Sequence, residues 1–94
     1  MEQRNQEIQI KLNEETAKGI YSNATIISHT QTEFLLDFVT IFHGKGVLSS
    51  RMILSPNHAK SLLRVLSENV AAFENKFGEI KDLGESKLNL SDVH

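Results

Sequence analysis

The sequence from Gly19 to Phe42, GIYSNATIISHTQTEFLLDFVTIF, decides the fold because most of it is typical of β-strands. β-Branched and aromatic residues dominate it, and a short polar stretch at residues 30–32 interrupts it. This pattern predicts one strand over residues 20–29, a turn, and a second strand over residues 33–42. Asp37 stands in the most apolar part of the second strand, so its role is the main question that the sequence raises.

Two further strands are predicted on either side of this region. Residues 8–12 alternate apolar and polar side chains, which is typical of a half-buried strand. Residues 47–54 form another β-rich stretch, after a turn over residues 43–46 that contains two glycines. Because the connections between successive strands are short, we expect a four-stranded antiparallel meander.

A long helix is predicted over residues 56–77 by its caps and by its periodicity. Ser55 suits the N-cap, Pro56 suits the first helical position, and Gly78 suits the residue that ends a helix. Apolar residues between them recur at spacings of three and four and form a seam along one face of the helix: Ala59, Leu63, Leu66, Val70, Phe73 and Phe77. We therefore expect an α+β domain in which this C-terminal helix packs on one face of the sheet.

Asp37 is predicted to pair with Arg51 of the neighbouring strand. If the hairpin loop consists of the three residues 43–45, Phe42 faces Gly46 and Asp37 faces Arg51. A two-residue loop would instead place Arg51 on the opposite, phenylalanine-rich face. We favour the first register because it pairs the opposite charges and leaves one face wholly apolar.

The predicted ion pair lies on a face that is otherwise apolar, with Leu35, Val39 and Ile41 on the same side of the strand. One helix covers only one face of a small sheet, so the second face is either solvated or buried against another copy. We expect Asp37 and Arg51 to hold the strand register at the interface of a homodimer or tetramer. A ligand-binding role for the pair is the alternative.

Composition limits the class of protein further. The chain has 94 residues, no cysteine, 10 basic and 12 acidic residues. We expect a single domain over residues 7–80, a flexible N-terminus over residues 1–6, and a flexible or loosely docked tail over residues 81–94. The charge balance argues against nucleic-acid binding. Because no signal sequence or long apolar run is found, we expect a cytoplasmic protein without membrane contact.

No pattern typical of an active site occurs in the sequence. The four histidines have no metal-ligand spacing, and the serines lack a nucleophile-elbow motif. The run Gly44-Lys45-Gly46 lacks the remainder of a phosphate-binding loop. We therefore expect no enzymatic activity, no catalytic residues, no cofactor and no metal.

Positive charge near the start of the predicted helix offers a second possible site. His58, Lys60 and Arg64 lie in its first turns, where backbone N–H groups favour anions. Together with Lys45 they form a candidate site for an anion or an acidic partner. Simple solvation of these side chains is the alternative.

Five short motifs carry a family resemblance: YSN at residues 21–23, EFLLDF at 33–38, RMILSP at 51–56, HAKSL at 58–62 and FGEI at 77–80. Together they resemble the small bacterial and archaeal family named Domain of Unknown Function family 3467. The resemblance implies no activity, but it implies that Asp37, Arg51, His58 and Lys60 share a structural or binding role. Four strands followed by a long helix is also broadly the layout of the bacterial export chaperone SecB, which assembles through its sheets.

These observations lead to one expected function and one alternative. We expect a non-catalytic, homo-oligomeric protein-interaction module, an adaptor or a chaperone-like protein, with a protein partner of unknown identity. The alternative is a protein that binds a small anionic ligand or nucleic acid through the helix N-terminus and the 43–46 turn.

Overall fold

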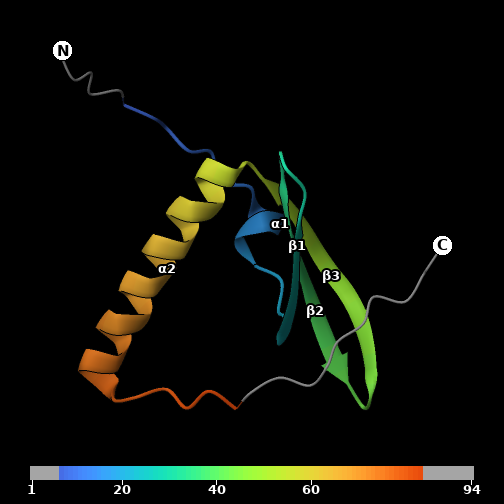
Figure 1. Cartoon of the computed structure of the whole chain (residues 1–94), viewed down its shortest axis with the longest axis vertical. Helices are drawn as coiled ribbons and strands as arrows, with labels where there is room; N and C mark the ends of the chain where they lie inside the picture. Colours follow the sequence, from blue (N-terminus) through green and yellow to red (C-terminus); the bar gives the residue numbers. More distant parts are fainter. Residues whose placement is uncertain (1–6, 84–94) are drawn as a thin grey trace.

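The computed structural model describes residues 7–83, and within them it contains two helices and three strands. Along the chain they are α1 (Glu14–Ala17), β1 (Ala24–His29), β2 (Phe34–Phe42), β3 (Lys45–Leu54) and α2 (Pro56–Phe77). The strands form one antiparallel sheet in the order β1-β2-β3, and α2 follows β3 (Figure 1). The α+β class and the antiparallel sheet are thus confirmed, with three strands in the described residues.

The fourth strand predicted over residues 8–12 is not formed. Residues 7–13 have no regular secondary structure, and all of them are exposed. Residues 14–17, between the first two predicted strands, form α1, because Asn13 caps its first turn. β1 begins at Ala24, later than predicted. The predicted flexible N-terminus over residues 1–6 and most of the predicted tail over residues 81–94 lie outside the described residues; of the tail, residues 81–83 are described, and they are exposed and without regular secondary structure.

The β2–β3 hairpin turns on two residues, His43 and Gly44, because Phe42 pairs with Lys45. Both turn residues have positive φ angles, 54° and 76°. Such angles are typical of a type I′ turn, whose twist matches the twist of the two strands. The predicted three-residue loop is therefore wrong.

The predicted pairing of Asp37 with Arg51 is nevertheless confirmed, because β3 contains a β-bulge. The register shifts by one residue between Phe38 and Val39, which leaves Ser49 as an extra residue in β3. The bulge offsets the shorter turn, so the charged pair keeps the predicted face, but on the turn side of the bulge Leu48 lies on this face where Val47 was expected.

The predicted bounds of the long helix are confirmed, and both of its ends are capped. The Ser55 hydroxyl accepts a hydrogen bond from the His58 N–H at 3.2 Å. At the other end, Gly78 has a φ of 103° and its N–H donates to the carbonyl of Glu74 at 2.9 Å. Local signals therefore define α2 completely.

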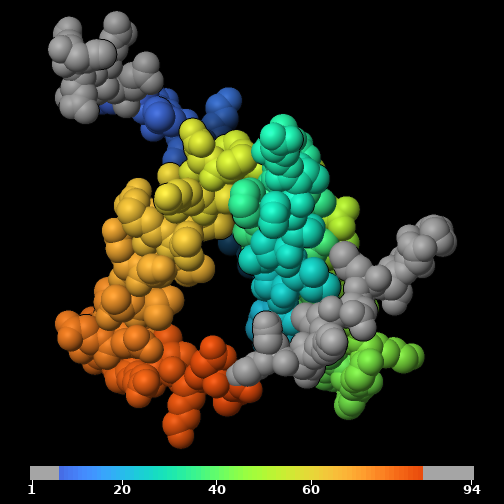
Figure 2. Space-filling view, in the orientation of Figure 1, coloured from blue at the N-terminus to red at the C-terminus, as the bar shows by residue number. Residues whose placement is uncertain are grey.

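The predicted packing of α2 across a sheet face is not observed. No residue of α2 is buried, and the five large side chains of the predicted apolar seam (the α2 seam) keep between 38% and 67% of their surface exposed. Figure 2 shows open space between α2 and the sheet. Only Ser55 separates β3 from α2, and from this point the helix runs back beside the sheet but diverges from it along its length (Figure 1).

The buried core of the described residues is correspondingly small. It consists of Leu36, Val39 and Leu54, together with the charged residue Asp37. All four belong to β2 or β3. The core therefore lies in the sheet, and strands β2 and β3 position the ion pair.

Candidate interaction site

Asp37 and Arg51 make a two-pronged ion pair between β2 and β3. The Arg51 Nε donates to Asp37 Oδ1 at 2.6 Å, and its Nη2 donates to Oδ2 at 2.8 Å. The side chain of Asp37 is only 2% exposed, whereas that of Arg51 is 44% exposed. Two parallel N–H···O bonds fix the direction of both groups, so the pair constrains the register of the two strands.

The ion pair changes the acidity of both groups. Hydrogen bonding from Arg51, and to a lesser extent its charge, lowers the pKa of Asp37 below its ordinary value of 3.8, while burial acts in the opposite direction. The same contacts raise the pKa of Arg51. In the sheet, Ile26 and Arg51 are the direct neighbours of Asp37, so the carboxylate is shielded mainly by adjacent strands. It is ionised at neutral pH.

The other predicted interface residues lie on the same sheet face as the ion pair. Val39 is buried, and Leu35 and Ile41 are half-buried. The cross-strand partners of Leu35 and Val39 are Ile53 and Leu48, which are both exposed on this face. The structure therefore brings the predicted residues together, and their part in an oligomer interface stays a prediction.

Three of the four predicted anion-site residues lie in the first turns of α2. A surface pocket there is lined by Pro56, Asn57, Lys60, Ser61, Leu63 and Arg64. The Arg64 Nη1 lies 3.4 Å from Glu68 Oε2, so the positive charge of Arg64 is partly neutralised by this ion pair. Lys45 is at the other end of β3, about 30 Å along a 10-residue strand. Lys60 and Arg64 thus lie together at this pocket, whereas His58 does not line it and Lys45 is far from it.

Asn23 is a positioning residue that the sequence did not reveal. Its side chain pairs with the main chain of Ile41 in both directions: Nδ2 donates to the carbonyl at 3.0 Å, and Oδ1 accepts from the N–H at 2.8 Å. The Thr40 hydroxyl donates to the carbonyl of Tyr21 at 2.8 Å. These contacts hold the YSN motif against β2. An asparagine directly before a β-rich run was the available signal.

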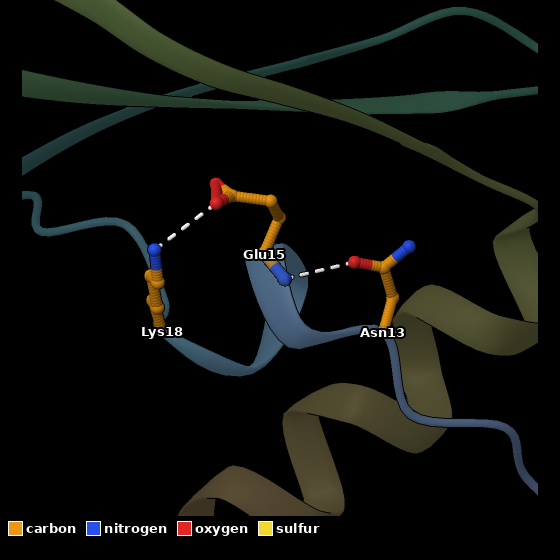
Figure 3. Close-up of polar contacts among 3 residues, drawn as sticks. All are labelled: Asn13, Glu15 and Lys18. Atoms are coloured by element: carbon orange, nitrogen blue, oxygen red, sulfur yellow. Dashed lines mark hydrogen bonds and ion pairs between the residues drawn. The ribbon is translucent and has the colours of Figure 1, made fainter.

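The short helix α1 is held by its own side chains. Asn13 Oδ1 accepts from the Glu15 N–H at 2.8 Å, and Lys18 Nζ lies 3.0 Å from Glu15 Oε2 (Figure 3). The helix lies between the sheet and α2 (Figures 1 and 3), yet all of its residues are exposed. α1 therefore sets the direction in which residues 7–13 run, but it does not pack against α2.

Two other kinds of feature are absent from the described part of the chain. Within residues 7–83, no three histidine, cysteine, aspartate or glutamate side chains come close enough to hold a metal ion. No helix in this range is long and apolar enough to cross a membrane. The expected absence of catalytic residues and cofactors stays a prediction.

Comparisons with curated proteins and with solved structures gave no match. A family model described as "Protein of unknown function (DUF3467)" matches residues 1–82 of the 94-residue chain. This match confirms the resemblance that the five short motifs carried. The match covers all three strands and both helices, and so the chain belongs to the DUF3467 family.

Proposed function

We propose that this protein is a non-catalytic, homo-oligomeric protein-interaction module. The observation that carries the proposal is the exposure of the α2 seam, an apolar row along a 22-residue helix with no buried residue. A continuous apolar face of this kind is usually covered in a folded protein. A second copy of the chain is the occupant that we propose for it.

The accessible surface of the chain supports this proposal. The chain exposes 9190 Å², whereas a compact protein of 10.6 kDa exposes about 5,500 Å². The residues outside 7–83 account for at most about 2,700 Å², the value for a fully unfolded segment of that length. When the mass and area of these residues are subtracted, the remaining chain exposes roughly 1,700 Å² more than a compact protein of the same mass. This excess is larger than the ~800 Å² that each partner buries in a standard interface.

The ion pair has a structural part in this proposal. Asp37 and Arg51 fix the register of β2 and β3, and so they fix which apolar side chains reach each face. Ile53 and Leu48 remain exposed beside the pair and extend the apolar surface available to a second copy. The pair therefore contributes to the shape of an interface more than to its energy.

Light scattering on the full chain after size-exclusion chromatography tests the proposal. We expect the mass of a dimer or tetramer that persists through stepwise tenfold dilutions. Leu63→Glu places a charge in the α2 seam and should weaken the assembly at least tenfold, whereas Ser61→Glu on the polar side of the helix should leave it unchanged. A folded monomer at every concentration would contradict the proposal.

The alternative function, binding of a small anionic ligand or nucleic acid, is supported only by the two cations Lys60 and Arg64, which line the pocket at the start of α2. Retention on heparin that falls steeply with salt, and that is lost in the double variant Lys60→Ala and Arg64→Ala, would favour it. The same variant with unchanged oligomer mass would separate the two functions. A cytoplasmic location and an additional protein partner belong to the main proposal and are not required by the alternative.

A further inference from the structure

Residues 8–12 carry three of the most exposed large apolar side chains among the residues that the structure describes. Ile8, Ile10 and Leu12 are 77%, 86% and 76% exposed. They alternate with Gln9 and Lys11, so in an extended segment all three project from one side of the backbone. The sequence of this segment suits a strand with one covered face, yet its own chain offers it no neighbouring strand.

The sheet has two edges that differ in their ability to accept another strand. The β3 edge carries Lys45, Arg51 and the bulge at Ser49, and charges and bulges are features that discourage edge pairing. The β1 edge has the sequence ATIISH over six residues, without a proline, a lysine or a bulge. Ile27 at this edge is 60% exposed. Within residues 7–83, no strand pairs with the outer edge of β1, and this edge is apolar.

The chain's own residues 8–12 are directed away from this edge. Tyr21 and Asn23 are held against Thr40, Ile41 and Val39 of β2 by four hydrogen bonds. From there the chain passes through α1 and leaves past the start of α2, on the far side from β1 (Figure 1). The segment is thus fixed to β2 at residues 21–23, and its other end, residues 8–12, points away from the sheet.

We infer that residues 8–12 form a fourth strand on the β1 edge of a second copy of this chain. Ile8, Ile10 and Leu12 then lie on the face of the sheet that carries Ile27, and Gln9 and Lys11 lie on the other face. Backbone hydrogen bonds to the open edge supply affinity, and the alternating side chains select the register. Reciprocal exchange between two copies closes both β1 edges by the same contact, as a two-fold symmetric dimer requires.

This inference rests on the proposed function, since it needs a second copy, but it depends on a different part of the chain from the α2 seam. Amide hydrogen exchange on the full protein tests it at two concentrations, above and below dissociation. We expect residues 8–12 and the outward amides of β1 to be protected in the oligomer and to exchange rapidly on dilution. Protection that is independent of concentration would place the strand on its own sheet and overturn the inference.

Two variants at one position provide the matched test. Ile10→Pro removes a backbone donor from the middle of the segment and should weaken the oligomer at least tenfold and remove protection from β1. Ile10→Val keeps the alternation of apolar and polar residues and should change neither the strength of the oligomer nor the protection of β1. A stable oligomer with residues 8–12 unprotected would overturn this inference and leave the proposed function standing. A monomer at all concentrations would overturn both.

A spin label gives an independent readout of the same contact. The chain contains no cysteine, so Gln9→Cys provides a single attachment site. When labelled chain is mixed with isotopically labelled wild-type chain, we expect signal broadening at Ile26 and Ile27 of the unmodified copy. Broadening confined to the start of α2 would contradict the strand exchange.

Discussion

The β2–β3 hairpin and helix α2 are almost equal in length, yet they differ completely in burial. The hairpin spans residues 34–54, and α2 has 22 residues. Each of the buried residues found in the described part of the chain belongs to the hairpin, and none belongs to α2. The hairpin is held by contacts within its own sheet, whereas the helix has its caps and little else.

This difference shows that a stable helix has two requirements: signals that define its ends, and a surface that buries its apolar face. Caps and periodicity decide where a helix begins and ends, and in α2 both signals are complete. Stability comes mainly from burial of the apolar face, because helices without tertiary packing are marginal in water. Under the proposed function, the helix is the part of the molecule that depends most on a second copy, and the hairpin depends on it least.

The largest effect is expected for Leu66→Ala in the α2 seam. If a second copy covers this face, the substitution should lower the free energy of unfolding by about 2–5 kcal/mol, as for a buried leucine. Urea denaturation at several protein concentrations measures the loss, because the stability of an oligomer depends on concentration. Ser67→Ala on the same helix is the control, with a change of less than ~0.5 kcal/mol. An equally small change for Leu66→Ala would show that α2 is uncovered.

A smaller effect is expected within the hairpin for Asp37→Ala. The variant removes both hydrogen bonds to Arg51, but that side chain is 44% exposed and regains water. We therefore expect a loss of about 1–3 kcal/mol at pH 7, and a weaker oligomer if the pair shapes the interface.

The pH dependence of this loss follows from the lowered pKa of Asp37. Between the folded value and the ordinary value of 3.8, the unfolded chain binds more protons than the folded chain. The contribution of the pair is thus complete above about 3.8 and is lost as the pH falls through the folded pKa. Urea titrations from pH 7 to pH 2 should show wild type converging on Asp37→Ala, and Ser67→Ala, which removes no ionisable group, should remain parallel to wild type. A constant difference at all pH values would contradict the ion-pair account.

The sequence predicted best what is determined locally. The bounds of α2 followed from Ser55, Pro56 and Gly78, which are adjacent to the helix ends that they create. The first turns of α2 likewise keep Lys60 and Arg64 together, because their spacing of four places them on one helical face. Lys45 was wrongly grouped with them, because the length of a strand separates the turn from the helix.

The pairing of Asp37 with Arg51 was predicted correctly although its premise was wrong. The turn is one residue shorter than expected because His43 adopts a positive φ, which is uncommon for a residue other than glycine. The bulge at Ser49 adds the residue back. Charge pairing therefore proved a better guide to register than loop length. The exposure of α2 could not be predicted. Periodicity shows which face of the helix is apolar, but it does not show whether the sheet of the same chain packs against that face.

A moderate effect on the hairpin side of the comparison is expected for Asn23→Asp. The new carboxylate keeps the acceptor for the Ile41 N–H but turns an oxygen toward the Ile41 carbonyl, where the amide donated at 3.0 Å. We expect a loss of about 1–2 kcal/mol, because one hydrogen bond becomes a repulsion. Asn69→Asp is the control on α2, where the side chain makes a single bond, to the Val65 carbonyl one turn earlier in the same helix, and connects no other element. Equal effects of the two changes in urea denaturation would contradict a special role for the YSN motif.

The smallest effect is expected from a pair of glycine variants in the hairpin. A Cβ at Gly46 would lie 3.4 Å from Val39 Cγ1 and 3.8 Å from Ile41 Cγ1, so Gly46→Ala should stabilise the protein by about 0.4–1 kcal/mol through added contact and a less flexible unfolded chain. Gly44→Ala should destabilise it, because φ is +76° there. Thermal unfolding followed by circular dichroism at a helix-sensitive wavelength measures both. If α2 is secured by a second copy of the whole fold, its helical signal should shift with the hairpin, whereas a helical signal that ignores both variants would show that hairpin and helix are stabilised independently.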